Sequence, residues 1–208
     1  MKSNKTKSLV FLGLLTALLF IMAYTPLGYL NIGPLAVTFN TIPVGIAAFA
    51  MGPVGGAVIG GVFGLTSFLQ CFGGSVLGTT LFGVNPVLTI LLCFIPRILD
   101  GLLIGFISET MKKKAASAAI IGSVTGFFSA FFNTLFYMSL LILFFGSSEV
   151  IQNYREQIAP GKNILIFVCM FVGINAVAEM ISSTLLTGGV SAALAKAKLV
   201  AVPKKAKD

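Results

Sequence analysis

The chain has 208 residues, of which 57% are hydrophobic and only 10% are charged, and its mean hydropathy is +1.02. A water-soluble domain carries about a quarter of its residues as charged side chains, so this composition excludes an ordinary soluble protein. Residues 8–96 contain no Asp, Glu, Lys or Arg at all. The sequence therefore predicts an all-α integral membrane protein.

The chain divides at its charges, prolines and glycine pairs into six hydrophobic segments. In chain order they are residues 9–24, 41–51, 53–70, 86–111, 115–145 and 163–196. A helix needs roughly 20 apolar residues to cross the bilayer, so we expect the second segment to be a short or irregular helix that other helices shield from lipid. We predict a bundle of six transmembrane helices over residues 9–196, between basic tails at residues 1–8 and 197–208.

The basic residues indicate how this bundle lies in the membrane, because cytoplasmic loops retain Lys and Arg. Eleven of the fourteen fall on one predicted side: Lys2, Lys5, Lys7, Lys112, Lys113, Lys114, Lys196, Lys198, Lys204, Lys205 and Lys207. Arg155 and Lys162 fall in an opposite loop, and Arg97 lies inside a segment. We therefore expect both termini in the cytoplasm, and we attribute the net charge of +8 to topology and anionic lipid rather than to nucleic-acid binding.

Several kinds of chemistry are excluded by missing residues. The chain has no His, so neither a Ser-His-Asp or Cys-His nucleophile nor a His-bound zinc site can be built. Cys71, Cys93 and Cys169 share no metal or redox spacing, and we interpret them as apolar filler. The phosphate-binding motif G-x-x-x-x-G-K-[ST] is also absent. We therefore expect no catalytic residues, no metal and no cofactor in this chain.

Small residues recur at every fourth position in several segments, which places them on one helix face where another backbone can approach. They are Gly52, Gly56, Gly60 and Gly64 in the third segment, Gly101 and Gly105 in the fourth, Ala118, Gly122, Gly126 and Ala130 in the fifth, and Gly13 and Ala17 in the first. We interpret these stripes as packing within the bundle, except for the pair in the first segment.

Polar side chains at membrane depth are costly unless they are paired, so each is a candidate site. Arg97 lies near the middle of the fourth segment, one helical turn from Asp100. The two could form a self-contained ion pair, or Arg97 could bind a carboxylate or phosphate of a substrate. The remaining candidates for substrate binding are Asn133, Tyr137, Asn175 and, in the outer loops, Asn40, Gln70 and Asn85. We interpret Glu179 as structural.

Three short runs resemble a known family. Residues 42–57 begin with Ile-Pro-Val and end with Met-Gly-Pro-Val-Gly-Gly-Ala, and residues 64–68 read Gly-Leu-Thr-Ser-Phe. Residues 96–102 read Pro-Arg-Ile-Leu-Asp-Gly-Leu. Together with the six segments, these runs resemble the substrate-binding component of an energy-coupling factor (ECF) vitamin transporter, and within that family they look most like the pantothenate group.

The resemblance implies a component in a prokaryotic plasma membrane that binds a vitamin in a cavity open to the outside. It implies as partners a transmembrane coupling protein and two ATPase subunits, which use the ATP. The coupling contact of the family resembles an Ala-x-x-x-Ala pair on the first helix, and Gly13 and Ala17 hold the matching positions. A single buried Arg97 suits an anionic substrate such as pantothenate.

Two alternatives stay open at this point. One is an ECF component for another vitamin or precursor, of the pyridine or pyrimidine type. The other is a solitary proton-coupled secondary transporter in which Asp100 or Glu179 carries the proton, although the first three and last three segments show no evident internal repeat.

Overall fold

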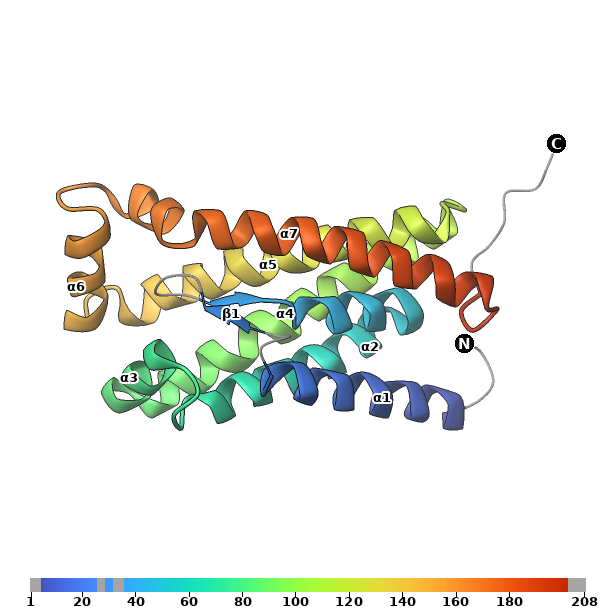
Figure 1. Cartoon of the computed structure of the whole chain (residues 1–208), viewed down its shortest axis with the longest axis horizontal. Helices are drawn as coiled ribbons and strands as arrows, with labels where there is room; N and C mark the ends of the chain where they lie inside the picture. The colour runs from blue at the N-terminus through green and yellow to red at the C-terminus, as the bar shows by residue number, and fades with distance from the viewer. Residues whose placement is uncertain (1–4, 26–28, 32–35, 202–208) are drawn as a thin grey trace.

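A computed structural model describes residues 5–25, 29–31 and 36–201. Four of the basic residues, Lys2, Lys204, Lys205 and Lys207, lie outside this part of the chain. The elements in chain order are α1 (Lys5–Ala23), β1 (Tyr29–Asn31), β2 (Ala36–Thr38), α2 (Thr41–Gln70), α3 (Val76–Val84), α4 (Pro86–Lys113), α5 (Ala118–Phe145), α6 (Glu149–Ile158) and α7 (Ile164–Lys196). The long helices lie alongside one another in an elongated bundle (Figure 1).

Five stretches of helix in the described residues are long and apolar enough to cross a bilayer. They are Lys5–Ala23, Thr41–Gln70, Pro86–Lys113, Ala118–Phe145 and Asn175–Lys196. A shorter apolar stretch, Ile164–Gly173, comes before the last of these in α7. The chain is therefore a helical multi-pass membrane protein, as its composition predicts.

The second and third expected segments are joined in α2, which is broken at Gly52. Gly52 has φ 71° and ψ −156°, a conformation that glycine adopts without a Cβ clash. The chain turns back there. Ser129 joins Thr41, at the start of α2, to Asp100 of α4, and Phe49 then contacts Lys112 near the end of α4. After the turn, Gly60 lies against Arg97, again close to Asp100 along α4. Figure 1 shows the two parts of α2 as separate rods. Gly52 thus belongs to a turn and not to the small-residue stripe in which we had placed it.

The first part of α2 is as short as expected and is shielded on all sides. Every residue from 41 to 50 is buried. The end of a helix leaves carbonyl groups without intrahelical partners, and one of them is satisfied here because Lys112 Nζ donates to the Phe49 carbonyl oxygen. The same ammonium lies 4.9 Å from the centroid of the Phe49 ring.

The other glycine stripes bring helix backbones into contact. A methyl group added at Gly56 would overlap the carbonyl oxygen of Gly101 on α4, and one added at Gly126 would overlap the carbonyl oxygen of Ser183 on α7. The helix pairs α2–α4 and α5–α7 accordingly form the largest interfaces of the bundle. Lipid supplies no hydrophobic drive between helices, so close backbone approach is what holds them together.

The connections between helices contain more structure than the sequence indicated. The outer loop expected between the third and fourth segments contains α3, whose first turn is capped by Ser75 accepting from the Gly78 backbone N–H. The predicted outer loop with Arg155 and Lys162 contains α6, which lies across the end of the bundle in Figure 1. Both helices are too short to span, so a search for apolar segments of membrane length passes over them.

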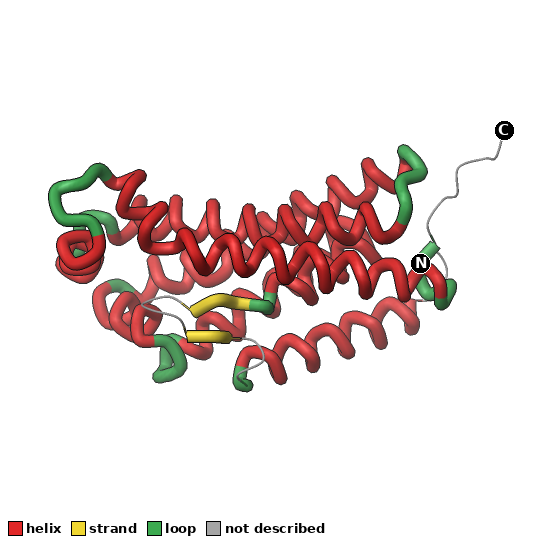
Figure 2. Tube along the Cα trace, turned by 45° about the horizontal axis from the view of Figure 1, so that its top comes forward, coloured by secondary structure: helices red, strands yellow, loops and turns green. Residues whose placement is uncertain are grey.

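A short two-stranded hairpin accompanies the helices of this all-α bundle. β1 and β2 pair antiparallel, with Tyr29 opposite Thr38 and Asn31 opposite Ala36. Figure 2 shows the hairpin, in yellow, along the flank of the helices. Strands of three residues leave too little alternation in the sequence to be recognised.

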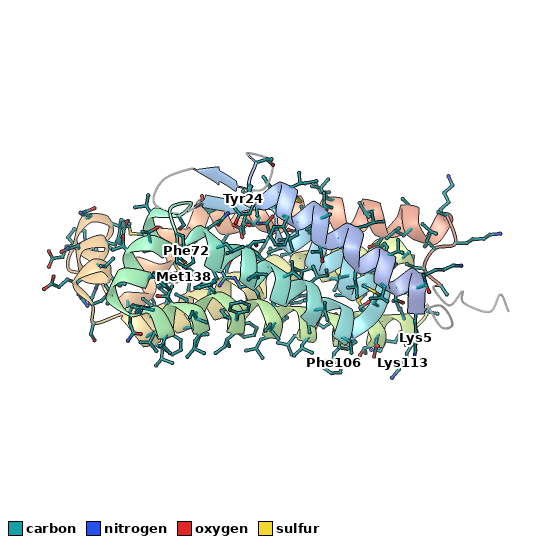
Figure 3. The ribbon with its side chains drawn as sticks, turned by 90° about the horizontal axis from the view of Figure 1, so that it is seen from below. Lys5, Tyr24, Phe72, Phe106, Lys113 and Met138 are labelled. Carbon is teal, nitrogen blue, oxygen red and sulfur yellow. The ribbon has the colours of Figure 1, made fainter. Side chains whose placement is uncertain are left out.

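The two ends of the bundle differ in charge. α1 begins, α4 passes into α5 and α7 ends at one end, on the right in Figure 1, and Lys5 and Lys113 lie there in Figure 3. We call this the basic end. α3 and α6 lie at the opposite end, which we call the far end.

Candidate functional site

A cavity of about 750 Å³ lies toward the far end of the bundle. Its wall includes Tyr24 after α1, Thr38 of β2, Leu77 of α3 and Met138 of α5. Tyr24 and Met138 lie well away from Lys5 in Figure 3. This volume falls within the range of about 300–1,000 Å³ that is usual for small-ligand sites.

Two charged side chains line this cavity among the described residues, Arg97 from α4 and Glu179 from α7. Both are almost completely buried, at 8% and 5% exposure. The structure records no ion pair between these two described side chains. Gln70, Asn133 and Asn175 add amide groups to the wall.

The guanidinium of Arg97 is held by contacts that use few of its donors. Nη1 donates to the Leu92 carbonyl oxygen at 2.7 Å. The guanidinium carbon lies 4.5 Å from the ring centroid of Tyr137 and 5.3 Å from that of Phe63. Nε is buried and has no hydrogen-bond partner. Because a guanidinium has five N–H donors in a rigid fork, this arrangement leaves donors for an anionic ligand.

The ion pair between Arg97 and Asp100 that we considered is not formed. Asp100 is fully buried and does not line the cavity. Its Oδ2 accepts a hydrogen bond from Ser129 Oγ on α5 at 3.0 Å, and the same hydroxyl lies 3.2 Å from the Thr41 carbonyl oxygen at the start of α2. Asp100 therefore helps to join three helices, while Arg97 one turn away faces the cavity.

The predicted polar strip of α5 lies in the cavity wall. Asn133 is 6% exposed, and its Oδ1 is enclosed without a hydrogen-bond partner. Tyr137, one turn further on, lies beneath the guanidinium of Arg97. Gln70 reaches the cavity from the end of α2, and its Nε2 donates to the Ala23 carbonyl oxygen at 2.8 Å. The structure thus brings together five of the seven residues proposed from the sequence to bind substrate, these four and Asn175.

Asn40 and Asn85 lie outside the cavity wall. Asn85 Oδ1 accepts from the Leu88 backbone N–H at 3.1 Å and caps α4. Asn40 precedes α2 and is completely buried, and its side chain has no hydrogen-bond partner. An Asn followed directly by Pro is a common helix start, so the sequence already held the signal for Asn85.

Sequence reasoning placed Glu179 outside the site, but it lines the cavity. Its Oε1 accepts from the Thr38 backbone N–H at 2.7 Å. The hairpin that brings Thr38 to α7 was not foreseen, so this contact could not be found from helix spacing. Cys71 and Cys93 also line the cavity, with their sulfur atoms 4.0 Å apart, and both thiols are free.

Gly13 and Ala17 lie on the side of α1 that faces away from the bundle. Both are exposed, and no atom lies within 4 Å of a methyl group added at Gly13. The buried stripe of α1 consists of Leu15, Leu19 and Ala23. The small pair therefore takes no part in packing the bundle, unlike the glycines of α2 and α5.

Comparison with known proteins places these features in a family. A family model described as "ECF transporter, substrate-specific component" matches residues 7–191. The Pantothenate transporter PanT of Leuconostoc mesenteroides subsp. mesenteroides is 31% identical over 199 residues, which cover 91% of this chain and 93% of the relative. The Pantothenic acid transporter PanT of Lactococcus lactis subsp. cremoris is 27% identical over 211 residues, which cover 95% of this chain and 98% of the relative. The chain therefore belongs to the substrate-specific components of ECF transporters, a family of transporters and not of enzymes.

Proposed function

We propose that this chain captures pantothenate from outside the cell and delivers it through an ECF-type importer. The observation that carries the proposal is the buried guanidinium of Arg97, which faces a cavity of vitamin size and forms no ion pair with any acidic side chain that the structure describes. A buried cation with free donors is costly unless an anion completes it. Two relatives that bear the name of pantothenate transporters support the choice of this anion.

The chemistry of the cavity suits each group of pantothenate. The carboxylate accepts from the fork of Arg97, and such charge-assisted hydrogen bonds are roughly twice as strong as neutral ones. Asn133 Oδ1 lacks a protein partner and can accept from an amide N–H or a hydroxyl. Gln70, Tyr137 and Asn175 place further polar groups in the same wall.

The basic residues at one end of the bundle support an orientation in the membrane, and the exposed face of α1 supports a docking surface. We infer that the basic end faces the cytoplasm of a prokaryotic cell, with both termini on that side. The cavity then lies toward the outside. Gly13 and Ala17 are exposed on the part of α1 between the basic end and the cavity, where a helix of a transmembrane coupling protein can approach closely. ATP is hydrolysed by two partner ATPase subunits.

Calorimetry of the purified protein against a panel of vitamins tests the proposal. The chain has no Trp, so calorimetry is preferred to fluorescence, together with mass spectrometry of any ligand that co-purifies. We expect tight binding of one pantothenate per chain. Binding of a pyridine or pyrimidine precursor in its place would assign the runner-up substrate, and binding of no vitamin would refute the proposal.

Reconstitution tests the alternative of a solitary transporter. Liposomes that contain this chain alone should accumulate no pantothenate when an ion gradient is imposed. Addition of the coupling protein and the ATPase subunits, with ATP inside, should start uptake. Accumulation driven by the ion gradient alone would contradict the proposed division of labour.

A further inference from the structure

The cavity contains a carboxylate that recognition of an anion does not explain. Glu179 shares the cavity with Arg97 but forms no ion pair with it within the described residues. An acidic side chain repels an anionic ligand, so a role in binding the ligand's carboxylate is excluded. Its burial at 5% exposure makes an idle charge costly.

One oxygen of Glu179 is fixed by the hairpin. Oε1 accepts from the Thr38 backbone N–H at 2.7 Å, and Thr38 lies 141 positions earlier in the sequence. Thr38 is itself buried, and its Oγ1 accepts from the Asn40 backbone N–H at 3.2 Å. The carboxylate of Glu179 is therefore held in one orientation before any ligand arrives.

The hydrogen bond to the hairpin engages Oε1 of Glu179 and not Oε2. The side chain that carries both oxygens lines the cavity. A carboxylate offers about four acceptor sites and no donor. The group that completes Glu179 must therefore be a donor, such as a hydroxyl or an amide N–H of the ligand.

We propose that Glu179 determines specificity for a hydroxylated ligand, by accepting a ligand hydroxyl on Oε2 while Oε1 holds the hairpin. This inference rests on the proposed function. The carboxylate of pantothenate binds Arg97, and its two hydroxyls lie at the other end of the molecule, across the amide. The cavity thus presents a cation for one end of the ligand and an acceptor for the other.

A cycle of two proteins and two ligands tests this assignment. The proteins are wild type and Glu179→Gln, which keeps an oxygen for the Thr38 N–H and removes the charge. The ligands are pantothenate and its analogue with both hydroxyls replaced by hydrogen, which keeps the carboxylate and the amide. Wild type should prefer pantothenate by about 10- to 100-fold, the usual worth of a hydrogen bond to a charged group. Glu179→Gln should lose most of that preference.

Arg97→Gln is the matched control, because it should weaken both ligands by a similar factor and leave the preference intact. An unchanged preference in Glu179→Gln, or an equal loss of affinity for both ligands, would overturn the assignment. Should Glu179→Gln fail to fold, wild type alone decides: equal affinity for the two ligands overturns the inference. Wild type that binds neither ligand overturns the proposed function, and this inference with it.

Discussion

The two halves of the bundle differ in the space that packing leaves beside their buried polar groups. Toward the far end, Arg97 and Asn133 face a cavity and keep donors or acceptors that no protein group satisfies. Nearer the basic end, Asp100 and Thr41 share the hydroxyl of Ser129 between closely packed helices. A polar residue at membrane depth therefore marks a binding site only where packing leaves space beside it.

The half nearer the basic end, which we call the closed half, should be the most sensitive to added bulk. Gly56→Leu is therefore expected to have the largest effect. Its side chain would overlap the backbone of Gly101, which cannot move without separating α2 from α4. We expect a loss of about 3 kcal/mol or more in the free energy of unfolding. Thermal unfolding in detergent measures it. Gly13→Leu, with open space around it, is the control and should unfold like wild type. Equal stability of all three proteins would show that α2 and α4 are not in backbone contact.

The half that contains the cavity, which we call the open half, should respond differently. Removal of the positive charge of Arg97 there should weaken ligand binding and leave folding intact. Arg97→Gln is expected to weaken pantothenate binding by about 2 to 5 kcal/mol, the usual loss when a buried charge-assisted pair is broken. Calorimetry gives the affinity, and the unfolding temperature serves as the control. Normal affinity combined with poor folding would mean that Arg97, like Asp100, stabilises the fold and does not bind the ligand.

Asp100→Asn tests whether the two halves act separately, because Asp100 lies one helical turn from Arg97 but belongs to the closed half. The amide oxygen of Asn can still accept from Ser129, so we expect a change in pantothenate affinity of less than about 1 kcal/mol. The measurement is the same titration as for Arg97→Gln. A loss as large as that of Arg97→Gln would mean that Asp100 reaches the ligand and that the two halves are not separate.

The smallest effect on the isolated protein is expected from the double variant Gly13→Leu with Ala17→Leu. Both positions are exposed on α1 and neither belongs to the cavity wall, so stability and pantothenate affinity should equal those of wild type. In the assembled importer, however, the added bulk should block close approach of the coupling protein and abolish ATP-dependent uptake. Normal uptake would exclude this face of α1 as the docking surface, and lost binding would mean that the pair packs the bundle.

Much of the fold could be predicted because lipid imposes simple rules on sequence. A single sequence is enough to recognise long apolar helices, basic residues at one end and glycine stripes. The turn at Gly52 left a weaker one, since a Gly-Pro pair between two apolar segments is compatible with a kink as well as with a reversal. The hairpin and α6 left none that a search for membrane spans detects.

The site was only partly predictable, because helix spacing gives the depth of a residue but not the space beside it. Arg97 and Asn133 were found by their cost in lipid. Asn40 and Asn85 were proposed from the outer loops, yet they stand at helix starts outside the cavity. Glu179 was interpreted as structural, and its contact with Thr38 could not be predicted because the pattern of apolar segments does not reveal the hairpin.

The proposed function requires that the open half selects a carboxylate through Arg97. Titration of the purified protein with pantothenate and with its neutral primary amide tests it most directly, because the two ligands differ only at the group that Arg97 should bind. We predict that the amide binds at least about 30-fold more weakly, equivalent to about 2 kcal/mol. Equal affinity for the two ligands would contradict the account.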